Sequence, residues 1–329
     1  MLMVFSFCKK KDDPEPPATE EPAPNPINSA DTGIYACKKI PAPPGPFGWT
    51  DSTVDVNKNV NFFMRNPLNG DEMIVVVDGD LFGYNKMFNI NLKTKQQKFL
   101  ANIDDFTPDV NARGWILFST YEDNIYRIKT NGDSLTAVSK INVAHNPHWD
   151  YTGDNMYFFQ KAYANVPAQL VKANRFGQTI TALPHTMAHH APFKKSDKVI
   201  RQKITDNIVT LVLRNMVDYS EKDLISGPYK GASAPAHFSN LCLDQNDQNI
   251  YWSNASGIFR CNLLSMKTDT LFKNCDNRIY MRPKMVLNTG EMTYSLLLKR
   301  IINEQILFHE YKTFEYDIPS RQSREIKIF

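Results

Sequence analysis

The sequence predicts an all-β protein, more specifically a six-bladed β-propeller with four antiparallel strands in each blade. Two observations support this prediction: prolines open units of similar length, and each unit carries two short strand-like runs separated by turns. Units of roughly 40 to 48 residues fit the four strands of one propeller blade. Five openings recur along the chain at intervals of 39 to 48 residues, at Pro108, Pro147, Pro192, Pro235 and Pro283.

The clearest unit covers residues 145–159, where a proline and an aromatic residue lead into an Asp/Gly turn and then an apolar run. The second run of a unit is clearest at residues 125–133, which alternate apolar and polar side chains and end at Asn-Gly. This pattern is typical of a half-buried strand followed by a hairpin turn. Residues 170–177 and 257–262 repeat it. The alternative interpretation is an irregular β-sandwich.

A first unit that opens near Asn61 brings the number of units to six, and the last one covers residues 280–329. An incomplete ring would leave an unpaired sheet edge. We therefore expect a strand from the N-terminal part to complete the last blade. Residues 33–37 are the candidate, because they form an apolar run with no hairpin partner nearby.

Two of these units resemble a known propeller repeat. Residues 146–159, NPHWDYTGDNMYFF, and residues 124–139, NIYRIKTNGDSLTAVS, resemble the repeat of TolB-type six-bladed propellers. Residues 249–263, NIYWSNASGIFRCNL, also resemble the related Tyr-Trp-Thr-Asp repeat. The resemblance spans about residues 60–329, although the Ser-Pro-Asp-Gly turn of the TolB repeat reads DYTG at residues 150–153. It implies the fold and no particular TolB role.

The N-terminal residues 1–8 are apolar and end at Cys8, which a charged run follows. The apolar run is too short to span a bilayer and lacks the basic leader of a secretory signal. It resembles the truncated end of a bacterial lipoprotein signal, in which Cys8 would carry the lipid, although Phe7 stands where a small residue is expected. The charged run resembles the export signal of Bacteroidetes-type surface lipoproteins. The alternative is an apolar N-terminus with a chance cysteine.

Composition divides the rest of the chain into a spacer and a folded body. Ten of the twenty prolines precede residue 47, and residues 9–30 predict a Pro/Glu-rich flexible tether to a propeller at residues 31–329. The net charge of +3 comes without a basic stripe, which argues against nucleic acid as a partner. We expect membrane contact only through the lipid anchor.

The four remaining cysteines leave one pairing open. Cys242 lies between two leucines and is expected to be a buried small hydrophobic residue. Cys261 and Cys275 are close enough in sequence to lie on neighbouring strands, and an exported protein could oxidise them. The spacing does not decide whether these two cysteines form a disulfide.

Histidines are the main candidates for a site. His145 and His190 each stand two residues before an opening proline, so we expect them to face one end of the central channel from adjacent blades. The other histidines expected at that level are His148, His189 and His237. Imidazoles that converge there could bind a divalent transition metal through His145 and His190. We expect instead that these residues pack beside the prolines and that the protein holds no cofactor, and we keep the divalent metal site as the alternative.

No Gly-x-Ser-x-Gly elbow, dinucleotide fingerprint or phosphate loop occurs in the sequence, and no carboxylate pair stands out as catalytic. We therefore expect a lipid-anchored protein of the bacterial cell envelope, an outer-membrane lipoprotein facing the periplasm or the surface, that binds an envelope protein or glycan without catalysis. The resemblance also supports an alternative, because oligogalacturonate lyases use a TolB-like ring with a histidine-rich metal site. That alternative is a metal-assisted polysaccharide lyase or hydrolase, and a third is a structural scaffold.

Overall fold

A computed structural model describes most of the chain after residue 35. The described ranges are residues 36–46, 48–54, 60–79, 84–104, 108–139, 144–184, 190–228, 238–287 and 289–329. Every helix or strand within them is a β-strand, and none of these ranges holds a helix long and apolar enough to cross a bilayer. Cys8, His189 and His237 lie outside the described residues, as do residues 1–30 with the expected signal remnant and tether.

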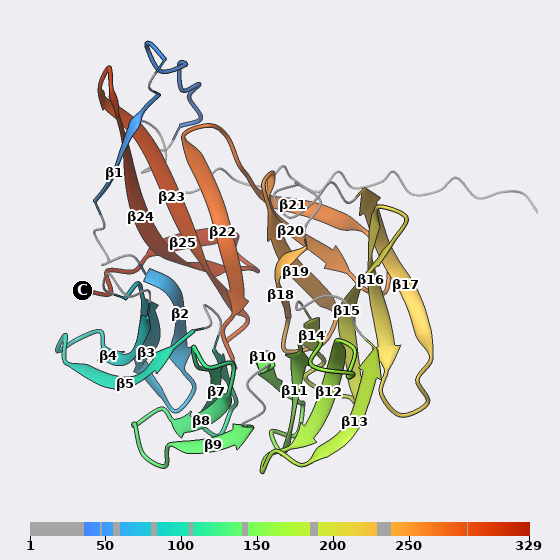
Figure 1. The fold of residues 1–329 in the computed structure, drawn as a ribbon. Coiled ribbons are helices and arrows are strands. Elements are labelled where there is room, and N and C mark those ends of the chain that lie inside the picture. Colours follow the sequence, from blue (N-terminus) through green and yellow to red (C-terminus); the bar gives the residue numbers. More distant parts are fainter. Residues whose placement is uncertain are drawn as a thin grey trace, which may run out of the picture.

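The strands form six sheets of four or five strands, antiparallel except where β1 pairs with β24, and the sheets are arranged as the blades of a propeller (Figure 1). The predicted six-bladed fold is confirmed, and its first blade begins at Val60, next to the expected start at Asn61. The first three blades comprise these strands: blade 1, β2 (Val60–Asn66), β3 (Asn69–Val77), β4 (Asn85–Asn91) and β5 (Gln97–Ile103); blade 2, β6 (Asp109–Val110), β7 (Trp115–Ser119), β8 (Ile125–Lys129) and β9 (Thr136–Ser139); blade 3, β10 (Ala144–Trp149), β11 (Asn155–Gln160), β12 (Gln169–Asn174) and β13 (Thr179–Pro184).

The second half of the ring follows the same order, with one addition in the last blade. Its strands are: blade 4, β14 (His190–Pro192), β15 (Lys198–Thr205), β16 (Ile208–Asn215) and β17 (Glu221–Pro228); blade 5, β18 (Ser239–Leu243), β19 (Asn249–Asn254), β20 (Gly257–Asn262) and β21 (Thr268–Lys273); blade 6, β22 (Arg278–Met285), β23 (Glu291–Asn303), β24 (Ile306–Asp317), β25 (Gln322–Glu325) and β1 (Thr50–Val54).

Blade connectivity gives the ring two different faces. The turn face carries the turns between the first and second and between the third and fourth strands of each blade, such as residues 150–154 and 175–177. The crossover face carries the connections from one blade to the next and the turns between second and third strands. On the turn face, the Asp150 carboxylate accepts hydrogen bonds from the backbone N–H groups of Thr152, Gly153 and Asn155 at 3.1, 2.9 and 3.2 Å. The expected Asp/Gly turn therefore forms because this side chain binds the backbone around it.

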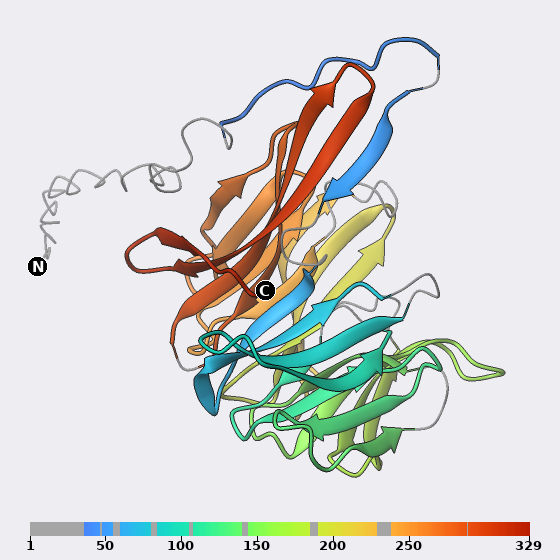
Figure 2. The same cartoon turned by 90° about the vertical axis from the view of Figure 1, so that its left-hand side faces the viewer.

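An N-terminal strand does complete the last blade, but it is not the strand expected from the sequence. Residues 33–35 of the expected strand lie outside the described residues, and Ala36 and Cys37 belong to no strand. The pairing strand is β1, which runs parallel to β24 from Thr50↔Ile306 to Val54↔Glu310. β25 pairs with the other part of β24. The long β23–β24 hairpin rises with β1 beyond the rest of the ring (Figures 1 and 2). The outer edge of β24 is thus shared by two short strands from opposite ends of the chain.

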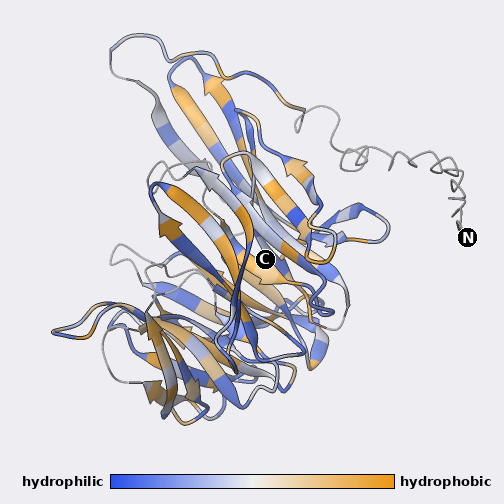
Figure 3. Cartoon of the chain, turned by 90° about the vertical axis from the view of Figure 1, so that its right-hand side faces the viewer, coloured by the Kyte–Doolittle hydropathy of each residue, from blue (hydrophilic) through white to orange (hydrophobic). Residues whose placement is uncertain are grey.

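The hydrophobic core lies between neighbouring blades rather than at one centre. Hydrophobic colour concentrates in segments of the strands in Figure 3. One buried cluster joins blades 1 and 2, and another joins blades 5 and 6. At the seam between the first and last blades, Ile326 and Ile328 from the C-terminal tail pack against the core of blade 1. Their alternation with exposed Glu325 and Lys327 matches a strand-like segment with one buried face.

A disulfide links the N-terminal segment to the junction of blades 5 and 6. Cys275 pairs with Cys37, across 238 residues of sequence and with a Cα–Cα distance of 5.8 Å. Cys261 is a free buried thiol, as is Cys242, so the pairing of Cys261 with Cys275 that the sequence left open does not form. Buried Asn277 reinforces the link, because its amide donates to the Ala36 carbonyl at 3.0 Å and accepts from the Lys38 N–H at 2.8 Å.

We expect reduction of this disulfide to destabilise the protein. A Cys37→Ser, Cys275→Ser double variant should lose about 2–4 kcal/mol of unfolding free energy, because a cross-link over a long loop restricts the unfolded chain. Urea unfolding of both proteins, with and without dithiothreitol, checks this. Dithiothreitol should lower the stability of the wild type to that of the double variant and leave the double variant unchanged. Equal stability of all four samples would contradict it.

Candidate functional site

The first strands of the blades surround a narrow central cavity that contains a buried carboxylate. Asp109 begins β6, is 4% exposed, and accepts a hydrogen bond from the Trp149 backbone N–H at 2.8 Å. His148 of β10 places its Nδ1 3.9 Å from Asp109 Oδ2. The ammonium groups of Lys194 and Lys284 also act on this carboxylate, and both residues line the same cavity. The cavity thus holds a polar centre within an otherwise mainly apolar wall.

The charges of this centre depend on one another. Burial alone would raise the pKa of Asp109, but the charge of Lys194 and the imidazole of His148 outweigh it and hold the pKa of this carboxyl well below its usual range. Burial lowers the pKa of His148, and the contact with Asp109 offsets this only in part. Asp109 is therefore ionised and His148 neutral near pH 7.

This arrangement predicts a loss of stability in mild acid. His148 has a lower pKa folded than unfolded, so the unfolded chain binds its proton first and stability falls as the pH drops below about 6.5. We expect the unfolding free energy of the wild type to fall more steeply between pH 7 and pH 5 than that of His148→Gln, by up to about 1.4 kcal/mol per pH unit. Urea titrations at several pH values measure both slopes. Burial also lowers the pKa of His309, so the slope of His309→Gln shows how much of the pH dependence comes from that second histidine. Identical slopes for wild type and His148→Gln would contradict the prediction.

The structure brings His190 to His148 rather than to His145. The rings of His148 and His190 meet edge to face, with centroids 4.8 Å apart. The first turns of the blades explain this difference from the expected arrangement. The Asp150 N–H donates to Asn155 O and the Phe193 N–H to Lys198 O, each at 2.9 Å, so Asp150 and Phe193 are equivalent positions.

Counting back three residues from those positions aligns Pro147 with His190, not with Pro192. The proline of blade 4 is thus shifted by two residues relative to that of blade 3. A bulge in β10 between His145 and His148, where Asn146 has φ 46°, displaces His145 further. His145 and His190 therefore do not occupy equivalent places in their blades.

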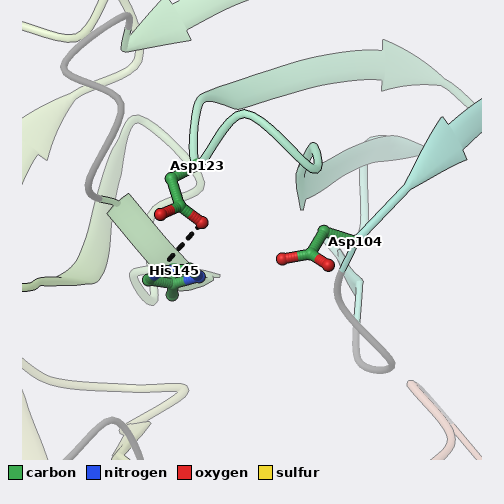
Figure 4. A group of neighbouring side chains, drawn as sticks. All are labelled: Asp104, Asp123 and His145. Carbon is green, nitrogen blue, oxygen red and sulfur yellow. Dashed lines mark ion pairs between the residues drawn. The ribbon is translucent and has the colours of Figure 1, made fainter. Parts of the chain in front are cut away.

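His145 instead joins two carboxylates on the crossover face. Its Nε2 lies 3.0 Å from Oδ1 of Asp123, and Asp104 directs its carboxylate toward the same space (Figure 4). One potential ligand atom from each of the three residues lies within 4.8 Å of the others. The residues come from three segments: the end of β5, the β7–β8 turn and the start of β10. Imidazole and carboxylate donors of this kind suit a divalent metal, although Lys161 also contacts Asp123 at 3.3 Å.

These carboxylates illustrate what the sequence alone misses. Asp123 lies in a tight turn with φ 57°, and Asp104 follows a strand, so each fits an ordinary turn carboxylate. Only the folded ring places them beside His145. The structure describes nothing of His189 and His237, whose part in a site stays a prediction.

A larger cavity opens where the central channel reaches the turn face. Its volume is about 500 Å³, and turns from several blades line it. Tyr151, which is 45% exposed, and Lys195 contribute side chains from blades 3 and 4. The Asp247 carboxylate accepts hydrogen bonds from the N–H groups of Lys194 and Lys195 at 2.6 and 2.7 Å, which fixes the turn that carries both lysines. The wall combines amide, ammonium and aromatic groups.

Comparison with solved structures supports the fold. A protein assigned as TolB from Agrobacterium tumefaciens superposes with a TM-score of 0.55 at 10% identity, over 73% of this chain and 87% of that one. An acylaminoacyl peptidase in complex with Z-Gly-Gly-Phe-chloromethyl ketone gives a TM-score of 0.50 at 11% identity, over 83% of this chain and 47% of that one. No protein-family model and no curated protein matches the sequence. These likenesses show a TolB-like propeller fold, and a fold does not by itself decide function.

Proposed function

We propose that this propeller binds a protein partner of the bacterial cell envelope, without catalysis, through the cavity at its turn face. The observation that carries the proposal is the cavity of about 500 Å³ at the channel mouth, lined by turns of several blades and by exposed Tyr151. Concave sites with convergent polar groups are the usual binding sites of such folds. Turns held by their own side-chain hydrogen bonds present these groups with little loss of conformational entropy on binding.

The cell-envelope location rests on two independent features. The Cys37–Cys275 disulfide supports an oxidising compartment, because structural disulfides are rare in the cytosol. Cys8, which precedes the proline-rich tether, supports a lipid anchor and hence an outer-membrane lipoprotein. Incorporation of radiolabelled palmitate into the full-length protein, and its loss in Cys8→Ser, tests the anchor. A protein that takes up no label when expressed from an upstream start would overturn it.

A glycan partner and a metal-assisted lyase or hydrolase are the alternatives. The observation that favours the second is the grouping of Asp104, Asp123 and His145, which could hold a divalent metal on the crossover face. Metal analysis of the purified protein beside Asp123→Asn and His145→Ala distinguishes the readings. Near-stoichiometric metal that both substitutions abolish would favour the enzyme and overturn the proposal of binding without catalysis. A metal-free protein would retire the alternative.

The proposed binding is tested by comparing captured partners. Tagged protein with Tyr151→Ala and Lys195→Ala should lose at least about nine-tenths of the envelope protein that the wild type retains, because exposed aromatic residues often dominate interfaces. Tyr163→Ala, which removes a tyrosine that is 61% exposed on the crossover face, is the matched control and should retain the partner. Quantitative mass spectrometry of the three captures gives the ratios. Loss with Tyr163→Ala alone would move the binding surface to the opposite face.

A further inference from the structure

A second, smaller pocket lies beside the channel mouth, between blades 2 and 3 on the turn face. Its volume is about 190 Å³, and it shares Arg113, Trp149 and Gly153 with the larger cavity. Arg127 of β8 lines it together with Trp115 of β7 and Phe176 of the β12–β13 turn. The pocket therefore continues the proposed binding surface outward from the channel.

The guanidinium of Arg127 lies between two aromatic rings and lacks an anionic partner. Its Cζ is 4.8 Å from the ring centroid of Trp115 and 5.6 Å from that of Phe176. Its Nε is shielded from solvent and makes no hydrogen bond. Among the residues that the structure describes, no carboxylate forms an ion pair with Arg127. This guanidinium has lost part of its hydration without gaining a counter-charge, which is less favourable than pairing with a carboxylate.

The surroundings of Arg127 add positive charge rather than offset it. Arg113 and Arg175 share one carboxylate oxygen, Oδ1 of Asp154, at 3.0 and 3.4 Å. The ammonium of Lys129 lies 5.5 Å from the centroid of the Trp115 ring. Burial and the charge of Arg175 lower the pKa of Arg127 from its ordinary value. A bound carboxylate would relieve this excess of positive charge.

Blade 4 provides a matched arginine whose charge is already balanced. Arg214 lies 5.5 Å from the centroid of the Tyr219 ring, so it too rests on an aromatic face. Its Nη1, however, is 2.7 Å from Oε1 of Glu221, and Arg201 contacts the same oxygen. Stacking on an aromatic ring therefore does not by itself leave an arginine unpaired. The missing carboxylate distinguishes Arg127 from Arg214.

The exposed part of the pocket favours a protein as the source of that carboxylate. Phe176 is 64% exposed and stands directly beside Arg127 and Arg175. Tryptophan, tyrosine and arginine are the residues that most often dominate the energy of protein interfaces. Arginine also binds carboxylates through two parallel hydrogen bonds, which fixes the orientation of the bound group.

We propose that the pocket between Trp115 and Phe176 receives a carboxylate of the protein partner, which forms an ion pair with Arg127. The proposal rests on the proposed function and identifies the chemistry that the partner must present there. The carboxylate could belong to an acidic side chain or to the partner's own C-terminus, and the two sources share the same interaction with the guanidinium.

Calorimetric titration of the full-length protein with defined peptides tests this. The probes are capped hexaglutamate, capped hexaglutamine, and a hexa-alanine with an acetylated N-terminus and a free C-terminus. We expect capped hexaglutamate to bind with a Kd below about 1 mM, more weakly at higher salt, and hexaglutamine not to bind. Binding of the hexa-alanine instead would assign the site to a C-terminus. No binding of either carboxylate peptide would overturn the proposal.

Substitutions then locate the binding. Arg127→Gln should weaken binding of the carboxylate peptide at least about tenfold, whereas Arg127→Lys, which keeps the charge but not the planar donors, should weaken it less. Arg214→Gln is the control and should change the affinity less than about twofold, because that charge is already paired. Equal affinities of wild type and Arg127→Gln would overturn the assignment to this pocket. The partner capture could be lost with the Tyr151 and Lys195 substitutions but kept with Arg127→Gln. That result would support the proposed function and overturn the role of the Arg127 pocket in it.

Discussion

Glu315→Ala is expected to lower the free energy of unfolding by about 3 kcal/mol, since it leaves a partly buried arginine without its counter-charge at the seam of the ring. Glu315 lies on β24 with a side chain that is 2% exposed. Arg65 on β2 of blade 1 contacts both of its oxygens, with Nε–Oε1 at 2.5 Å and Nη2–Oε2 at 2.8 Å. Arg324 also pairs with the carboxylate, from the exposed side.

The magnitude lies at the low end of the range for breaking buried ion pairs because Arg65 is still 19% exposed and can recover some hydration. Urea unfolding measures it. Arg324→Ala is the comparison: its side chain is 67% exposed, and its removal should cost less than about 1 kcal/mol. A loss below about 1 kcal/mol for Glu315→Ala would show that the seam between blades 6 and 1 does not depend on this pair.

Gly177→Ala is expected both to destabilise the protein and to disrupt the smaller pocket that Arg127 lines. Gly177 has φ +86°, and an added Cβ would lie 1.7 Å from the carbonyl oxygen of Val138 on β9. Because backbone cannot move aside as a side chain can, the β12–β13 turn must lift away from blade 2. That movement would carry Arg175 and Phe176 out of the pocket, so carboxylate binding should fall together with the melting temperature.

Gly132→Ala separates the strain of a left-handed backbone from the clash of the added Cβ with neighbouring backbone. Gly132 has a similar φ of +83°, but its added Cβ would meet the flexible side chain of Lys98, at 2.9 Å from Cε. It should cost only the left-handed backbone strain of about 1–2 kcal/mol. Gly177→Ala should cost at least about 1–3 kcal/mol more, as over-packing against fixed atoms does. Equal losses in thermal unfolding would contradict a backbone clash at Gly177.

The propeller could be predicted from the sequence because its information is local and repeated. The Asp150 turn and the alternating run of β8 each contain their structural cause within a few residues, and six copies of similar length leave few other folds. The sequence predicted that an N-terminal strand completes the last blade, although β1 rather than residues 33–37 supplies that strand. The choice between two N-terminal segments depends on contacts with residues near the opposite end of the sequence, which local patterns do not contain.

The candidate sites could be predicted only in part, because their residues are joined by the fold. The proline register suggested that His145 and His190 meet, but a two-residue shift in blade 4 and the bulge at Asn146 bring His190 to His148. The Cys37–Cys275 pair is separated by 238 residues. Arg127 resembles any polar position of an alternating strand. Its missing partner becomes visible only when the side chains of blades 2 and 3 are placed together.

Photo-crosslinking in the producing cell tests the central claim, that the turn face binds a protein partner, most directly. The full-length protein would carry p-benzoylphenylalanine in place of Tyr151 at the channel mouth or, in a second strain, in place of Tyr163 on the crossover face. We expect one adduct of defined mass from the Tyr151 position, weakened by Arg127→Gln, and none from the Tyr163 position. No adduct at Tyr151, or an adduct only at Tyr163, would contradict the account.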